Sequence, residues 1–223
     1  MISENLERII KELPQGVRLV AVSKFHPLSE LQEAYAMGQR AFGENRPQEF
    51  AAKAVQLPQD IEWHFIGHLQ TNKLKLVLPY AHIVESVDTL HLLDAIEAWA
   101  KRNERRVRVL LEVHIGAEET KQGFSEDEVL ELLGGVAAGT DASYQHIDFC
   151  GLMGMASHTD DEDAVAADFA RIKALFDRCK AEFPQLEHFT ELSIGMTDDW
   201  RIAVAHGSTE VRIGTAIFGP RQY

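Results

Sequence analysis

The chain has 223 residues, of which 45% are hydrophobic and 26% charged, a composition typical of a globular protein with a buried core. Its formal net charge of −13 at pH 7 argues against the broad basic face that binding to nucleic acids or acidic membranes requires. Cys150 and Cys179 are the only cysteines and neither belongs to a CxxC pair, so the sequence shows no disulfide framework and no zinc-ligand pattern.

The first half of the chain alternates between helical and extended patterns. Apolar residues recur at helical spacing behind Ser3, an N-cap type of residue, and predict a helix over residues 3–13. Short apolar runs bounded by turn residues predict strands at residues 19–24, 41–43, 61–66, 81–87 and 107–115. Helical spacing between these runs predicts helices at residues 27–38, 47–57, 69–78 and 89–103.

The same alternation continues in the second half. Ser125 and Glu128 form a capping-box pattern, which predicts a helix that ends at Gly134 and Gly135 and is followed by a loop to residue 146. Further strands are predicted at residues 147–153, 191–194 and 210–213, and further helices at residues 162–179 and 198–205.

Strands that alternate with helices in this way predict an α/β fold with a parallel sheet and right-handed crossovers. A sheet of eight such units closes naturally, so we expect a single (β/α)8 TIM barrel over residues 1–223 with an extra N-terminal helix. An open doubly wound sheet is the alternative. In a barrel, the residues that follow the strands share one mouth, where active sites are found.

Lys24 ends the apolar run that begins at Leu19, just before His26 and Pro27. A lysine at the carboxyl end of a buried strand is costly as a charged group, because burial favours the neutral amine. A neutral lysine amine is a nucleophile that forms Schiff bases. The alternative is a solvated lysine where the strand emerges into a loop.

The last two predicted strands each lead into a glycine and a hydroxyl side chain, at residues 193–197 and 212–215. Barrels frequently bind phosphate in the loops after strands seven and eight, where backbone N–H groups and hydroxyls are donors. A cofactor with a phosphate at one end and an aldehyde that reaches Lys24 at the other is pyridoxal 5′-phosphate (PLP). The alternative for each loop is a turn glycine with a capping hydroxyl.

Five motifs lie along almost the whole chain, at residues 20–24 (VAVSK), 42–45 (FGEN), 63–73 (WHFIGHLQTNK), 192–197 (LSIGMT) and 211–219 (VRIGTAIFG). Together they resemble the YggS/PROSC family of pyridoxal phosphate homeostasis proteins, which are similar to the alanine racemase N-terminal domain. The resemblance implies a barrel that binds, carries or buffers PLP without established turnover. No catalytic residue and no metal site are expected.

The resemblance also implies the residues that bind the cofactor. Lys24 would form a Schiff base (the internal aldimine) with PLP, and Arg212 would lie against the pyridine nitrogen, where a guanidinium has only donors. The phosphate would be held by Ser193, Gly214 and Thr215, with backbone groups near Gly195 and Met196. The pocket wall would include Asn45 and His68, and His68 is interpreted either as a general base or as a hydrogen-bonded neutral histidine.

Some positions depart from the family pattern or stay open. Arg46 stands where the family usually has tyrosine, and Thr197 stands where it usually has serine. Lys121 lies in a segment that resembles a family loop whose lysine acts as a secondary amine near the mouth; the alternative is a solvated loop lysine. His64 and His68 are separated by the glycine that ends their strand, so they do not share a helix face as a zinc-binding pair would.

Three functions compete on the sequence. A PLP carrier is expected; an amino-acid racemase is the alternative, although no tyrosine falls at a predicted strand end to act on the opposite face. A cofactor-free aldolase would not need the two phosphate-type loops. We expect a monomer that exchanges PLP with apo PLP-dependent enzymes. A cytoplasmic location is expected because a signal peptide and an apolar run long enough to span a bilayer are both missing from the sequence.

Overall fold

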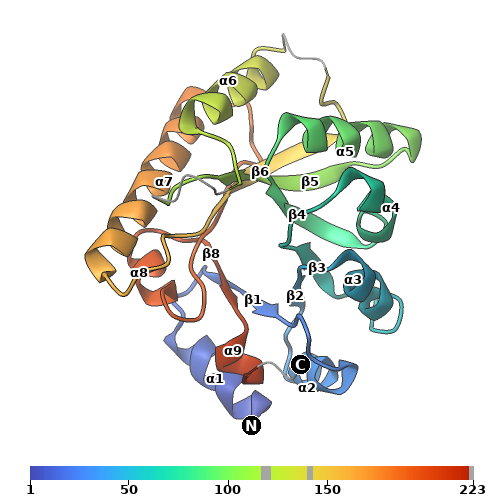
Figure 1. Ribbon diagram of the computed structural model, residues 1–223, viewed down its shortest axis with the longest axis vertical. Helices are drawn as coiled ribbons and strands as arrows, with labels where there is room; N and C mark the ends of the chain where they lie inside the picture. Colours follow the sequence, from blue (N-terminus) through green and yellow to red (C-terminus); the bar gives the residue numbers. More distant parts are fainter. Residues whose placement is uncertain (117–121, 140–142, 221–223) are drawn as a thin grey trace.

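The computed structural model is a closed barrel of eight parallel strands with helices on its outer face (Figure 1). It describes residues 1–116, 122–139 and 143–220. The strands follow one another around the barrel in chain order, and β1 pairs with β8 to close it. The predicted (β/α)8 barrel is confirmed, and the open sheet is excluded.

The strands begin and end within two residues of their predicted limits. Their bounds are Arg18–Val22 (β1), Ala41–Glu44 (β2), Glu62–Phe65 (β3), Ala81–Val87 (β4), Val107–Val113 (β5), Ile147–Gly154 (β6), Glu191–Ser193 (β7) and Glu210–Ile213 (β8). All eight are mainly buried, as expected of parallel strands covered by helices.

The helices bury Leu, Ile, Val and Phe side chains against the outward-facing residues of the strands in one hydrophobic core. Their bounds are Ile2–Glu12 (α1), Leu28–Ala36 (α2), Pro47–Ala54 (α3), Leu74–Val77 (α4), Leu90–Arg102 (α5), Glu126–Ala137 (α6), Glu162–Glu182 (α7), Trp200–Ala205 (α8) and Thr215–Phe218 (α9), with a 3-10 turn η1 at Thr71–Lys73. Within the described ranges, no helix is both long and apolar enough to cross a bilayer.

The extra N-terminal helix α1 is present and packs beside α2 and α9. The Asn5 amide donates to the Ile217 carbonyl of α9 at 3.1 Å. Ser3 was expected to cap this helix, but α1 begins one residue earlier, and the Ser3 hydroxyl donates instead to Glu33 of α2 at 2.8 Å. That prediction was wrong because a tertiary partner captured the hydroxyl.

Two glycines predicted to end α6 lie inside it. The capping box of Ser125 and Glu128 is formed as predicted, and α6 then runs through Gly134 and Gly135 to Ala137. A glycine costs a helix about 1 kcal/mol relative to alanine, and burial of an apolar helix face outweighs this. The short helix α9, which begins at Thr215, has no counterpart among the predicted elements.

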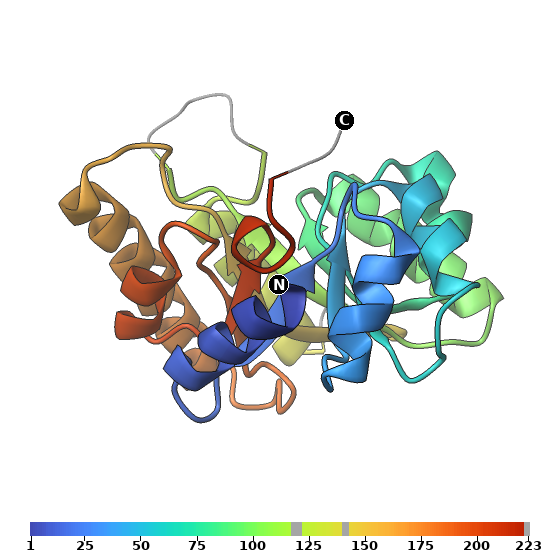
Figure 2. The same cartoon turned by 90° about the horizontal axis from the view of Figure 1, so that it is seen from below.

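The inside of the barrel contains buried polar side chains. Ser193 on β7 donates to Glu85 on β4 at 2.6 Å, and because these strands are not neighbours the bond crosses the barrel interior. The interior of such barrels is usually filled by branched apolar residues. In Figure 2 the barrel is seen from the side, and α9 and the segment that links β6 to α7 lie toward the upper edge, at the carboxyl ends of the strands.

Candidate functional site

The structure brings the residues named from the sequence to one end of the barrel. Each of them except Ser193 and Arg212, which lie on the strands themselves, follows the carboxyl end of a strand, and parallel strands share that end. The set is Lys24, Asn45, His68, Ser193, Gly195, Met196, Arg212, Gly214 and Thr215. Lys121 lies outside the described residues.

Lys24 lies beside the loop that follows β8. It comes two residues after β1, which pairs with β8, with Val20 opposite Arg212 in the register. A Cβ atom added to Gly214 would lie 3.0 Å from the carbonyl oxygen of Val22, so only glycine lets the two backbones come this close. The end of β1 that leads to Lys24 is therefore in contact with the loop expected to bind phosphate.

The loops after β7 and β8 touch each other through a hydroxyl that the sequence argument had not assigned. The Gly214 N–H donates to Thr197 Oγ1 at 3.4 Å, and the Arg212 N–H donates to the Gly195 carbonyl at 2.9 Å. The Met196 N–H already donates to Asp199 at 2.6 Å. The Thr197 hydroxyl keeps its own O–H as a donor, and the Gly214 N–H makes only the long 3.4 Å bond, whereas the Met196 N–H is held at 2.6 Å. This favours Thr197 and Gly214 over Met196 as donors to a ligand.

Ser193 lies deeper than a phosphate ligand at the mouth. Its side chain is fully buried, its hydroxyl donates to Glu85 at 2.6 Å, and it accepts from Arg212 Nη1 at 2.6 Å. Both hydrogen-bonding roles of this hydroxyl are thus used inside the barrel. The placement favours a role in holding Arg212, and phosphate contact by Ser193 stays a prediction.

The Arg212 side chain is buried and fixed. Nη1 donates to the Ser193 carbonyl at 2.7 Å and to its hydroxyl, and Nη2 donates to the Gly154 carbonyl at 3.0 Å. Glu85 lies 3.7 Å from Nη1 and balances the charge. A guanidinium held in this way presents a fixed positive charge and N–H donors at the mouth, and it does not release a proton.

Glu85 also contacts a second ionisable pair below Arg212. Its carboxylate lies 2.6 Å from His64 Nδ1, and His64 lies 3.6 Å from Glu210. Burial opposes the charged form of His64, but the Glu210 and Glu85 carboxylates outweigh it and raise the pKa of His64. Burial, followed by the Glu85 charge, raises the pKa of Glu210 to about 8.

His64, Glu85 and Glu210 form a group of three residues of types that can bind metals. Arg18 lies 4.0 Å from Glu210, and Arg212 lies 3.7 Å from Glu85, so cations already flank both carboxylates. The 2.6 Å contact between His64 and Glu85 is a hydrogen-bond distance. A shared proton, rather than a dication between two arginines, accounts for this arrangement.

The mouth also contains acid–base groups on the side of β3 to β5. His68 Nδ1 lies 3.0 Å from the buried Asp88 carboxylate, while about half of the His68 side chain is exposed. Burial, followed by the charge of Asp88, raises the pKa of Glu112 to about 7. Asp88 and Glu112 were missed from the sequence, although each is a lone acid at the carboxyl end of a predicted apolar strand.

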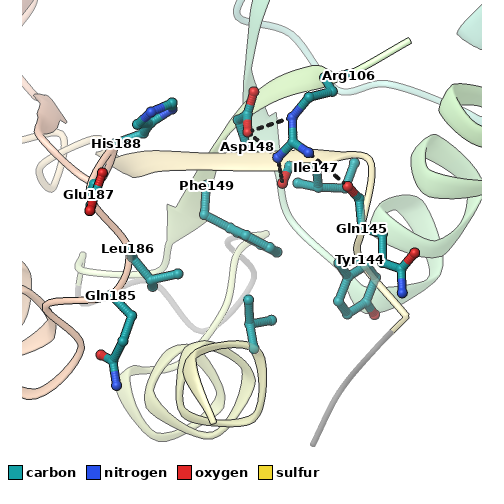
Figure 3. A pocket seen from close by; sticks show the side chains of 11 residues that line it. Arg106, Tyr144, Gln145, Ile147, Asp148, Phe149, Gln185, Leu186, Glu187 and His188 are labelled. Atoms are coloured by element: carbon teal, nitrogen blue, oxygen red, sulfur yellow. Dashed lines mark hydrogen bonds and ion pairs between the residues drawn. The ribbon is translucent and has the colours of Figure 1, made fainter. Parts of the chain in front are cut away.

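Two hollows help to locate the site. A cavity of about 470 Å³ opens beside His68 and Asp88 and extends the mouth toward Thr89 and His91. Another pocket, of about 350 Å³, lies at the amino end of β6, where Arg106 points toward Asp148 (Figure 3). The second pocket is at the opposite end of the barrel from Lys24 and is separate from the candidate site.

Asn45 gives a direct test of whether this mouth fits PLP. Its side-chain oxygen Oδ1 is buried and has no hydrogen-bond partner within the described part of the chain. A buried carbonyl oxygen without a donor is costly, and a hydroxyl group on a bound ring would satisfy it. Together with Lys24, the fixed Arg212 and the Thr197–Gly214 donors, Asn45 makes a set of side chains that fits PLP.

Comparison with known proteins defines the class of the barrel. The sequence family described as "Alanine racemase, N-terminal domain" matches residues 1–222. An alanine racemase from Corynebacterium glutamicum has the same fold, with a TM-score of 0.73 over 99% of this chain and 60% of its own, at 18% identity. The fold is therefore that of the alanine racemase barrel domain.

Two relatives are similar over their full length. The pyridoxal phosphate homeostasis protein of Pasteurella multocida is 36% identical over 100% of this chain and 95% of its own length. PipY of Synechococcus elongatus, solved with PLP bound, is 35% identical, with a TM-score of 0.88 over 98% of this chain and 100% of that chain. This chain belongs to the family of pyridoxal phosphate homeostasis proteins, which confirms the resemblance seen in its motifs.

Proposed function

We propose that this chain binds PLP at the carboxyl mouth of the barrel, with Lys24 as its attachment point, and serves in intracellular PLP homeostasis. One observation carries the site: the end of β1 before Lys24 lies in contact with the Gly214 loop, next to the fixed guanidinium of Arg212. The full-length similarity to PLP homeostasis proteins, one solved with PLP bound, supports the same function.

Each residue of the mouth then has a chemical role. PLP supplies an aldehyde for a primary amine and a ring that withdraws electrons. Lys24 would supply the amine, and Thr197, Gly214 and Thr215 would hold the phosphate, with Ser193 behind Arg212. Arg212 would donate to the ring nitrogen and leave it unprotonated, because a guanidinium does not release its proton.

We propose that this arrangement carries PLP without efficient turnover. An unprotonated ring nitrogen stabilises negative charge on a bound substrate poorly, and Arg212 is too firmly held to move away. The protein would then release PLP to apo PLP-dependent enzymes in the cytoplasm and act as a monomer. Assignment of residues 1–223 to one domain remains part of this proposal.

An amino-acid racemase is the second candidate function. The His68–Asp88 pair and Glu112, whose pKa is raised to about 7, put groups at the mouth that can exchange protons near neutral pH. A racemase needs such groups on both faces of the substrate carbon. Their position on one side of the mouth, along β3 to β5, favours the carrier.

The experiment is a PLP titration of the purified protein, followed by its absorbance spectrum, with Lys24→Ala beside Lys11→Ala as an exposed-lysine control. We expect a long-wavelength band in the wild type and the control that is absent in Lys24→Ala. Incubation with L-amino acids then separates the candidates. Racemisation at ordinary enzymatic rates would replace the carrier with the racemase, and no PLP band in the wild type would reject both.

A further inference from the structure

The residue after Lys24 has an unusual backbone conformation. Phe25 has φ = +69°, in the left-handed region that bulky residues rarely adopt without support. Its N–H donates to Glu49 Oε1 at 2.7 Å, and the Arg46 guanidinium lies 4.3 Å from the centre of its ring. The turn that presents Lys24 is therefore held from α3 and the residue that precedes it.

A buried lysine on α3 supports the same turn from the other side. Lys53 Nζ donates to the Ser23 carbonyl at 2.7 Å, to Glu44 at 2.6 Å and to Glu49 at 2.7 Å. An ammonium has three N–H donors, so these three bonds use all of them. Lys53 is nearly fully buried, which fixes its stem as well as its charge.

Glu44 completes the arrangement at the end of β2. Its carboxylate also accepts from the Ser23 hydroxyl at 2.6 Å, and it is fully buried. Burial raises the pKa of Glu44 despite the nearby Lys53 ammonium, so its ionised form depends on that partner. We call Ser23, Glu44, Glu49 and Lys53 the Lys53 cluster.

The cluster holds the chain at the two residues that flank Lys24. Ser23 is held through its carbonyl and hydroxyl, and Phe25 through its N–H. A turn fixed on both sides limits the directions in which the Lys24 stem leaves the backbone. Glu49 and Lys53 are four residues apart on one helix face, so α3 delivers both groups together.

From these contacts we propose that Lys53 and Glu49 are positioning residues that hold the Lys24 turn in its left-handed conformation and so aim the Lys24 amine at the aldehyde of PLP. The inference rests on the proposed function for the identity of the aldehyde. It predicts that loss of Glu49 or Lys53 on α3 weakens the reaction of Lys24 without weakening recognition of the ring nitrogen and the phosphate, which the residues of β8 and of the loops after β7 and β8 would bind.

The experiment compares two ligands that differ only at the reacting carbon. PLP carries the aldehyde, whereas pyridoxine 5′-phosphate has a hydroxymethyl group there and cannot react with an amine. In Glu49→Ala and Lys53→Met we expect PLP affinity to fall about tenfold or more, because orientation is a large part of the reactivity of a bound amine, with pyridoxine 5′-phosphate affinity unchanged within about twofold. Glu49→Gln, which keeps an acceptor for the Phe25 N–H, should retain most of the PLP affinity.

Glu97→Ala is the matched control. The Glu97 carboxylate also accepts a backbone N–H, from His146 at 2.9 Å, but at the amino end of β6, away from the mouth. It should leave the affinities for both ligands unchanged. Equal losses of both ligands in Glu49→Ala and Lys53→Met, or no loss of PLP, would overturn the inference.

A second measurement does not depend on PLP at all. Acetic anhydride labels the lysines of the cofactor-free protein, and mass spectrometry compares the rate at Lys24 with that at the exposed Lys11 in the same sample. We expect the ratio to change in Glu49→Ala and to stay constant in Glu97→Ala. An unchanged labelling ratio in Glu49→Ala would overturn the inference. If the wild type bound neither PLP nor pyridoxine 5′-phosphate, the proposed function would fail, but the labelling ratio would still decide whether Glu49 positions Lys24.

Discussion

The barrel has two buried charged clusters, and they hold different parts of the mouth. The Lys53 cluster lies where β1 and β2 end and grips backbone atoms on both sides of Lys24. The Glu85 cluster, composed of His64, Glu85, Ser193, Glu210 and Arg212, lies inside the barrel and grips one side chain, the Arg212 guanidinium. On the proposed function, one cluster would set the direction of the Lys24 amine, and the other would fix the Arg212 charge beside the PLP ring.

The clusters differ in the exposure of one member. Glu49 keeps 21% of its side chain exposed, although Glu44 and Lys53 of the same cluster are buried, whereas the side chains of His64 and Glu85 are completely buried. Loss of one partner leaves a buried charge unpaired in the interior, which is the more costly case. We therefore expect replacement of Glu85 to act mainly on stability and replacement of Glu49 to act mainly on the chemistry of the mouth.

Breaking the Glu85 cluster should have the largest effect. Glu85→Ala leaves Arg212 and His64 without their carboxylate in the interior, and removal of one partner of a buried ion pair costs about 3 to 5 kcal/mol. Urea unfolding measures the loss. Glu62→Ala, which breaks a half-exposed pair with Arg18, should cost no more than about 1 kcal/mol, and an equal loss in the two variants would contradict the contrast.

The raised pKa of Glu210 predicts how the free energy of unfolding changes with pH. Its pKa is about 8 in the folded protein and near 4.5 when unfolded, so its contribution to stability is fully present below about pH 4.5 and is lost as pH rises through 8. His64, with a raised pKa, acts in the same direction. The charged or titratable groups that act on Glu210 are Glu85, His64, Glu191 and Arg18.

Glu210→Gln should therefore flatten the decline in unfolding free energy between pH 5 and pH 8, by a few kcal/mol, since each pKa unit corresponds to about 1.4 kcal/mol. Urea denaturation across this range checks it, with Glu187→Gln as an exposed control on the loop before β7. A wild-type stability that rises over the same range would show that Glu210 is ionised in the folded protein.

The hydroxyls of Ser193, at the end of β7, and of Thr197, in the loop that follows, sharpen the comparison between the interior and the mouth. Thr197→Ala should lower PLP affinity by about 1.5 to 3 kcal/mol, the usual value of a hydrogen bond to a charged group, and leave pyridoxal affinity unchanged. Ser193→Ala removes a bond from Arg212 and should lower stability and the affinities for both ligands. Phosphate-selective loss in Ser193→Ala, but not in Thr197→Ala, would restore the assignment made from the sequence.

Arg46 gives the smallest expected effect. It stacks on Phe25 at the edge of the Lys53 cluster, and such a cation–π contact is worth about 0.5 to 1 kcal/mol at an exposed site. Arg46→Tyr keeps an aromatic contact and should change PLP affinity by less than about threefold. Isothermal titration measures it, and a loss as large as that of Glu49→Ala would mean that Arg46 is part of the grip on the turn.

The fold could be predicted because its signal is local. Eight apolar runs alternate with helical spacing, and this pattern leads to a closed parallel sheet. The positions of Lys24 and Gly214 followed from the same pattern. The N-cap at Ser3 and the end of α6 were wrong, because a tertiary partner and core packing outweighed local preference.

The supporting residues of the site could not be predicted, because their partners lie across the barrel. Glu85 reads as an isolated acid in an apolar strand, and its bond to Ser193 spans a sequence separation of 108 residues. Lys53 reads as an ordinary helix-surface lysine until α3 packs on the turn after β1. Residue spacing along the chain does not show which groups meet in the interior, so the bond between Ser193 and Glu85 could not be predicted, and phosphate contact by Ser193 stays a prediction.

The most direct measurement is borohydride reduction of the protein with bound PLP, followed by peptide mapping. The reduced adduct marks the amine that had reacted with the aldehyde. We predict one modified residue, Lys24, at about one PLP per chain. An adduct on another lysine, or none on a protein that binds PLP, would contradict the claim that this mouth holds PLP through Lys24.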